Sequence, residues 1–192
     1  MEAFSDGVIA IIITIMVLEL KAPSGHDIED LKPVIPVFIN YILSFIYVGI
    51  YWNNHHHMMK VVRSINGPIL WANLHLLFWL SLIPFVTAWM GENHFSSPWP
   101  IALYGLLLLM NGVAYSILVF ILIRHEGKNS VLATALGNDK KGKISVLIYS
   151  IAIELSWVNT YISFILYIGV ACIWFIPDKR IEKKIVEEKG VE

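Results

Sequence analysis

The sequence predicts an all-α, polytopic membrane protein with six transmembrane helices and no soluble domain. Of its 192 residues 57% are apolar, which exceeds the roughly 45 to 50% typical of soluble domains. Only 15% are charged and the formal net charge is -1, so no basic field exists to attract nucleic acid. A single cysteine, Cys172, cannot form a disulfide within the chain. These observations nearly exclude a water-soluble enzyme.

Crossing a hydrocarbon core of roughly 30 Å takes about 17 to 25 helical residues. Four apolar stretches meet this length, over 4–20, 36–59, 68–90 and 98–123. The next apolar region is about twice as long as one span, and the polar run 157–160 interrupts it. We therefore predict two short helices there, over 144–157 and 160–177. The chain, 1–192, is thus expected to form one six-helix transmembrane domain.

Prolines mark two features of the third span. Pro68 suits the first turn of a helix. Pro84 lies inside the span and is expected to kink it, because proline has no amide proton for the helical hydrogen bond.

The orientation follows from basic loop residues, which are held on the cytoplasmic side during insertion. They cluster after the second, fourth and sixth spans: Lys60 and Arg63; Arg124, Lys128, Lys140, Lys141 and Lys143; Lys179, Arg180, Lys183, Lys184 and Lys189. The opposite loops carry only Lys21 and Lys32. We therefore expect both termini, and the charged tail 178–192, to face the cytoplasm of a cell membrane.

The first span has one polar residue near its middle, Thr14. A hydroxyl in a membrane helix commonly donates to the carbonyl four residues earlier, here that of Ala10. A pore-facing hydroxyl is the alternative. Positions three, four and seven residues apart share a helix face, and the face of Thr14 contains Gly7, Ile11, Ile15 and Leu18.

Several copies of this face around an axis would line a pore. Ile11, Ile15 and Leu18 would form narrow apolar rings that act as a gate, and Thr14 would offer oxygens to a partly dehydrated cation. Packing against lipid or protein explains the isoleucines equally well, because this helix is apolar on all sides.

Polar residues also gather where the first and second spans meet the predicted cytoplasmic surface. Ser5 and Asp6 lie near the start of the first span, and residues 51–57 end the second span with His55, His56 and His57. Asp6 and a histidine are therefore expected to meet and to anchor one span to the other. A static hydrogen-bond network at the interface is the alternative.

The histidine run does not predict a metal site, because consecutive helical residues point about 100° apart and cannot all bind one ion. We expect no metal and no cofactor. The sequence also contains no Walker loop, no Gly-rich dinucleotide turn, no His-Glu-x-x-His and no Thr-Val-Gly-Tyr-Gly filter. An ATP-driven pump and a conventional potassium channel are therefore both disfavoured.

Three segments carry a family resemblance. Glu-Ala-Phe-Ser-Asp-Gly-Val at 2–8 precedes an apolar helix, Trp-Asn-Asn-His-His at 52–56 ends the second span, and 73–92 contains Leu-x-Leu-Ile-Pro-Phe-Val-Thr-Ala. In these segments the chain resembles the prokaryotic relatives of the endolysosomal potassium channel called transmembrane protein 175. The specific match covers about the first half of the chain.

The resemblance implies a passive, potassium-preferring cation channel with a central pore lined by the first helix and no carbonyl filter. Phe-Ser-Asp occurs once, so a symmetric homotetramer is the implied assembly and potassium is the implied permeating ion. The family's hydrophobic constriction corresponds to Ile11, with Ile15 and Leu18 on the same face, and its threonine layer to Thr14. Its motif network corresponds to Phe4, Ser5, Asp6, Trp52, Asn54, His55 and His56. The family usually has an arginine four positions before the phenylalanine, which would fall just before Met1.

Two other functions stay open at this point. A proton-coupled secondary transporter could use Asp6, His75, Glu154 and the histidine run as a relay. A nonconducting membrane interaction protein would use none of them for transport.

Overall fold

The apolar stretches of the sequence fold into helices, as their length and composition predict. A computed structural model describes residues 1–92, 95–127, 130–136 and 139–175, and within these ranges every regular element is a helix. In chain order they are α1 (Glu2–Leu18), the 3-10 helix η1 (Ile28–Val34), α2 (Ile35–Lys60), α3 (Gly67–Ser81), α4 (Ile83–Glu92), α5 (Pro98–Glu126), α6 (Val131–Leu136), α7 (Lys140–Leu155) and α8 (Thr160–Phe175). The predicted tail 178–192 lies outside the described residues.

Three helical stretches are long and apolar enough to cross a membrane: Ile28–Lys60, Gly67–Glu92 and Pro98–Glu126. Thr160–Phe175 is a shorter apolar helix. The prediction of an all-α, multi-pass membrane protein is confirmed, and each of the six expected spans overlaps a helix of the described residues. Their division into one six-helix domain stays a prediction.

The expected interruption between the last two spans is present, with slightly different bounds. α7 begins at Lys140, earlier than predicted, and ends at Leu155. The chain then turns, and Asn159 Oδ1 accepts from the amides of Tyr161 and Ile162 at the start of α8. A polar side chain thus satisfies backbone groups that the apolar surroundings could not.

The third span breaks near Pro84, as the missing proline amide requires. α3 ends at Ser81 and α4 begins at Ile83. Near the break, Asn111 of α5 donates to the carbonyl of Trp79 over 3.4 Å. The predicted start is also confirmed, since Asn66 caps α3 by accepting from the amide of Ile69 and Pro68 lies in its first turn.

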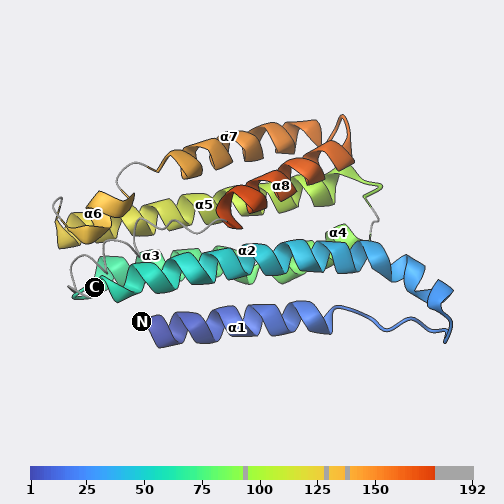
Figure 1. Ribbon diagram of the computed structural model, residues 1–192, viewed down its shortest axis with the longest axis horizontal. Helices are drawn as coiled ribbons and strands as arrows, with labels where there is room; N and C mark the ends of the chain where they lie inside the picture. Colours follow the sequence, from blue (N-terminus) through green and yellow to red (C-terminus); the bar gives the residue numbers. More distant parts are fainter. Residues whose placement is uncertain (93–94, 128–129, 137–138, 176–192) are drawn as a thin grey trace, which may run out of the picture.

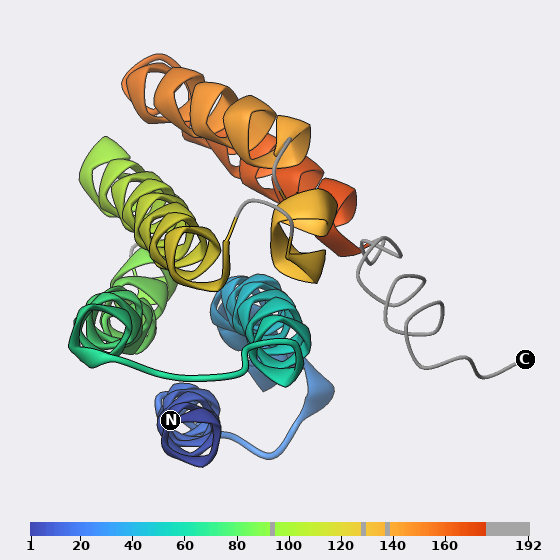
Figure 2. The same cartoon turned by 90° about the vertical axis from the view of Figure 1, so that its left-hand side faces the viewer.

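The helices run side by side along one long direction (Figure 1). α1 packs against α2, α3 and α4, while α5 packs against α3, α4, α7 and α8. Seen from the end, α1 lies at the edge of the bundle, with α2 and α3 on one side of it (Figure 2). One side of α1 is therefore not covered by the other described helices.

Helix ends that the topology assigned to one membrane surface meet in the structure. The amide of Arg63, after α2, donates to Glu126 Oε1 at the end of α5 over 3.1 Å. Ser64 and Asn66 both hydrogen-bond the ring of His125. The connection between α2 and α3 therefore lies beside the end of α5. The described basic residues that follow the second and fourth spans belong to this same end of the bundle.

Candidate functional site

The two faces of α1 differ sharply in exposure. Ser5, Ile9, Ile12 and Met16 are buried against the rest of the chain. At 100° per residue these positions centre on one side of the helix, and Gly7, Ile11, Thr14 and Leu18 lie on the opposite side. The face predicted to line a pore is thus the one that the described part of the chain leaves uncovered.

Large apolar side chains occupy this uncovered face. Leu18 is 80% exposed, Ile11 58% and Ile15 42%. In the isolated chain they contact neither the core nor a neighbouring helix closely enough to be buried. No described residue of the chain buries them, so lipid or a further copy of the chain can cover them.

Thr14 lies among these residues and is exposed. Its hydroxyl donates to the carbonyl of Ile11 over 2.8 Å. The expectation that a back-bonded hydroxyl would reach the Ala10 carbonyl was wrong by one residue. Because a hydroxyl has one proton and two lone pairs, this bond leaves the oxygen free to accept from, or to coordinate, a group outside the helix.

A buried polar chain joins α1 to α2 through α3. Asn73 Nδ2 donates to Ser5 Oγ over 2.9 Å, and Asn73 Oδ1 lies 2.8 Å from His55 Nε2. Ser5, Asn73 and His55 are each at most 1% exposed. Ser5 also donates to the carbonyl of Met1. Shielded from water, these bonds hold α1 at one rotation against its neighbours.

A second, more exposed set of contacts joins α1 directly to α2. Trp52 Nε1 donates to Asp6 Oδ1 over 3.0 Å. Glu2 Oε1 lies 2.9 Å from His56 Nδ1, an ion pair when the histidine is protonated. The rings of Trp52 and His56 stack, with centroids 5.6 Å apart and planes at 19°.

The predicted direct contact between Asp6 and a histidine is corrected by this geometry. Asp6 accepts from Trp52, and the carboxylate next to His56 is that of Glu2, one helical turn earlier. Glu2, Asp6 and His56 nevertheless place three potential metal-ligand atoms within 4.8 Å of one another. The expected absence of a metal site therefore stays a prediction.

Among the described residues, two of the seven predicted network residues have no hydrogen bond or ion pair with the other five. Asn54 donates to the carbonyl of Ile50 in its own helix. Phe4 is 58% exposed on α1. Ser5, Asp6, Trp52, His55 and His56 do gather where α1 meets α2.

The groups of the proposed proton relay do not gather. His75 accepts from Trp79 within α3, and Glu154 is exposed near the end of α7. Among the described residues, no hydrogen bond or ion pair joins either group to Asp6.

A hollow of about 530 Å³ adjoins the far end of α1, where Ile15 and Glu19 face α4. Glu92 also lines it and pairs with Lys21 over 3.2 Å. Carboxylates at this position can raise the local concentration of cations at the end of the uncovered face.

Sequence reasoning missed Asn73 and Glu2. Asn73 lies in an apolar stretch of the third span, and a polar side chain at membrane depth is a signal for a polar partner. Glu2 lies four residues before Asp6, which places both carboxylates on one helix face.

Comparisons with known proteins show the family of this chain. A family model described as endosomal/lysosomal potassium channel TMEM175 matches residues 1–84, which include α1, the motif residues and Asn73. A protein of Chryseobacterium sp. named as a potassium channel is 56% identical over 187 residues, 97% of each chain. A Streptomyces collinus protein named as a potassium channel is 32% identical over 130 residues, 64% of this chain and 63% of that one.

A solved structure has the same fold. It is the crystal structure of a lysosomal potassium-selective channel TMEM175 homolog from Chamaesiphon minutus. The TM-score is 0.76 at 24% identity, and the match covers 92% of this chain and 95% of that one.

Proposed function

Because the chain belongs to the TMEM175 family of channels, we propose that it is a potassium-preferring cation channel with a central pore lined by α1. The pore forms where the uncovered faces of α1 from four identical subunits converge around an axis. A symmetric assembly of this kind covers the exposed isoleucines and leucine of each copy. The channel lies in the cell membrane with both termini in the cytoplasm.

One observation carries the pore assignment. The face of α1 with Ile11, Thr14 and Leu18 lies opposite the buried face that fixes the helix in the bundle. A lining helix needs this division, because one side must pack within the subunit while the other meets ions.

Conduction is controlled by the apolar rings. Ile11, Ile15 and Leu18 narrow the path and exclude water from it when the rings are closed. Widening at Ile11 admits water and ions.

Thr14 supplies the polar layer of the path. Its proton is directed to the Ile11 carbonyl, so the oxygen lone pairs can replace part of the hydration shell of a cation. Potassium is dehydrated at lower cost than sodium, so one weak oxygen layer favours potassium modestly.

The function is tested with purified protein in liposomes. A gradient of potassium or sodium should drive a passive current whose reversal follows the gradient, with potassium the more permeant ion. A fixed proton stoichiometry at carrier rates would instead identify the coupled transporter. Absence of flux under potassium, sodium and proton gradients would identify a nonconducting interaction protein.

A further inference from the structure

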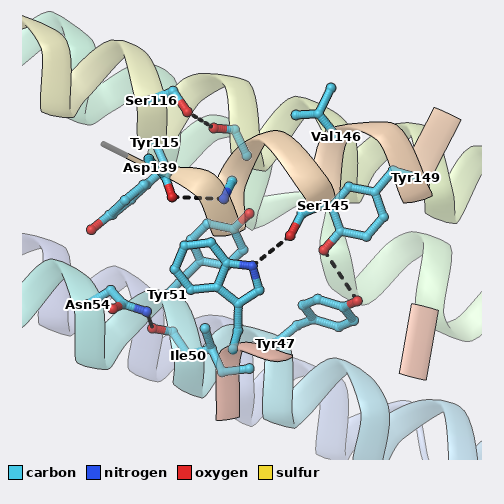
Figure 3. A pocket seen from close by; sticks show the side chains of 13 residues that line it. Tyr47, Ile50, Tyr51, Asn54, Tyr115, Ser116, Asp139, Ser145, Val146 and Tyr149 are labelled. Atoms are coloured by element: carbon cyan, nitrogen blue, oxygen red, sulfur yellow. Dashed lines mark hydrogen bonds between the residues drawn. The ribbon is translucent and has the colours of Figure 1, made fainter. Parts of the chain in front are cut away.

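A hollow remote from the uncovered face of α1 lies between α2, α5, α7 and α8 (Figure 3). Its inner part has a volume of about 40 Å³. Five of its thirteen lining residues are aromatic: Tyr47, Tyr51, Tyr115, Tyr149 and Trp174. The polar ends of three of them are used inside the protein, since Tyr149 donates to Tyr47, Tyr47 donates to the carbonyl of Tyr167, and Trp174 donates to Ser145. The space that remains is therefore largely apolar.

The inner part widens into an outer part of about 460 Å³ that shares Tyr115, Val146 and Trp174 with it. The outer part follows α5 past Phe120 and reaches Lys143 on α7. Phe120 is 65% exposed, so the hollow opens toward the outside of the bundle between two membrane helices.

Positive charge gathers near the mouth. Lys143 lines the outer part of the hollow, and Lys140 and Lys141 lie in the same first turn of α7. Asp139, which lines both parts, is the carboxylate next to them in the chain. That carboxylate is engaged, since it accepts from the amide of Gly142 over 2.8 Å. Lys141 Nζ lies 6.0 Å from the centroid of the Trp174 ring. The mouth therefore favours an anion, while the interior favours hydrocarbon.

The residues that line the hollow also extend along the helix axis. On α7 they run from Asp139 to Tyr149, positions ten residues apart, which is about 15 Å at the helical rise. In the proposed orientation the charged mouth lies at the headgroup level of the cytoplasmic leaflet, and the aromatic interior lies at the depth of the acyl chains.

We infer that this hollow binds an anionic phospholipid of the cytoplasmic leaflet, with its phosphate at Lys143 and part of an acyl chain among the tyrosines and Trp174. A free anion leaves the apolar interior empty, and a zwitterionic lipid lacks the net charge that matches the mouth. The site is separate from the ion path along α1, so the inference does not depend on conduction.

Lipids with brominated acyl chains test the inference, because bromine quenches nearby tryptophan fluorescence. Purified protein is placed in phosphatidylcholine bilayers that contain brominated phosphatidylglycerol or, separately, brominated phosphatidylcholine at the same mole fraction. The signal of Trp174 is the difference between the wild-type protein and Trp174→Phe. We expect this signal to be quenched at least threefold more strongly by the anionic lipid.

Paired variants locate the effect. Lys143→Gln should weaken the anionic preference about fivefold, the contribution of one lysine near an anionic surface. Lys60→Gln, at the basic end of α2 but not in the hollow, should change it less than twofold. Val146→Phe narrows the hollow and should abolish the quenching of Trp174, whereas Leu147→Phe, which does not line the hollow, should leave it intact.

Native mass spectrometry of the delipidated protein provides a second measurement if Trp174→Phe does not fold. Phosphatidylglycerol should be retained by wild-type and Lys60→Gln protein and lost from Lys143→Gln protein at the same lipid concentration. Equal quenching of Trp174 by both brominated lipids, together with equal lipid retention by both lysine variants, would overturn the inference. Absence of Trp174 quenching by either brominated lipid would also overturn it.

Discussion

Asn73 donates to Ser5 across 2.9 Å and so connects α3, the first part of the third transmembrane stretch, to α1. The oxygen of the same side-chain amide hydrogen-bonds His55 Nε2 on α2. One buried side chain thus sets the rotation of α1 relative to two neighbours. Because α1 is apolar on all sides, apolar packing alone would not specify which side faces outward.

Replacing Asn73 by Ala should lower the free energy of unfolding by about 2 to 3 kcal/mol, because Ser5 and His55 lose a partner while buried. Asn54→Ala is the matched control, since Asn54 bonds only the carbonyl of Ile50 within α2. The loss of helical content during unfolding in detergent gives the free energy of unfolding of each variant. Equal losses for the two variants would remove Asn73 from its anchoring role.

Asp6→Ala should destabilise the α1–α2 contact by about 1 kcal/mol, because the Trp52 indole loses its acceptor. Asp6→Asn keeps an oxygen and should recover most of that stability. Trp52→Phe should add little to Asp6→Ala, since both remove the same bond. Additive losses in the unfolding measurement would show that the two residues act independently.

Thr14→Val, which keeps the shape and removes the hydroxyl, should lower the permeability ratio of potassium to sodium by about two- to tenfold. Thr14→Ser keeps an oxygen and serves as the control. Reversal potentials under bi-ionic conditions give the ratio directly. A ratio that stays constant in Thr14→Val would exclude the hydroxyl layer as the source of selectivity.

Ile11→Asn should raise the resting current, because an amide holds water in a constriction that isoleucine keeps dry. Ile11→Leu preserves the apolar character and should leave the resting current close to that of the wild type. Single-channel recordings in bilayers separate more frequent opening from a larger unitary current. Indistinguishable resting currents in the two variants would place the gate elsewhere.

Much of the fold could be predicted because lipid imposes simple requirements on length and polarity. The interruption near Asn159 and the break at Pro84 followed from polar side chains and a missing amide. The short helices η1 and α6 were not predicted, because segments 28–34 and 131–136 are too short to show a periodic pattern of apolar residues.

The site was only partly predictable. Shared topology correctly brought Asp6 to the end of α2, but sequence could not show that Trp52 and not a histidine would be its partner. Asn73 gave no indication of where its partners lay, because they are 68 residues before it and 18 residues before it in the chain. Pore lining involves contacts between copies, which the sequence of one copy does not contain.

Thiol accessibility along α1 tests the central pore most directly. In a Cys172→Ser background, a water-soluble methanethiosulfonate reagent should block the current of Leu18→Cys rapidly, because the proposed pore places Leu18 in the ion path. Trp71→Cys places the thiol at an exposed position of α3, away from α1. The reagent should leave the current of this variant unchanged. An unblocked Leu18→Cys current, with the reagent shown by mass to reach Trp71→Cys, would contradict a pore lined by α1.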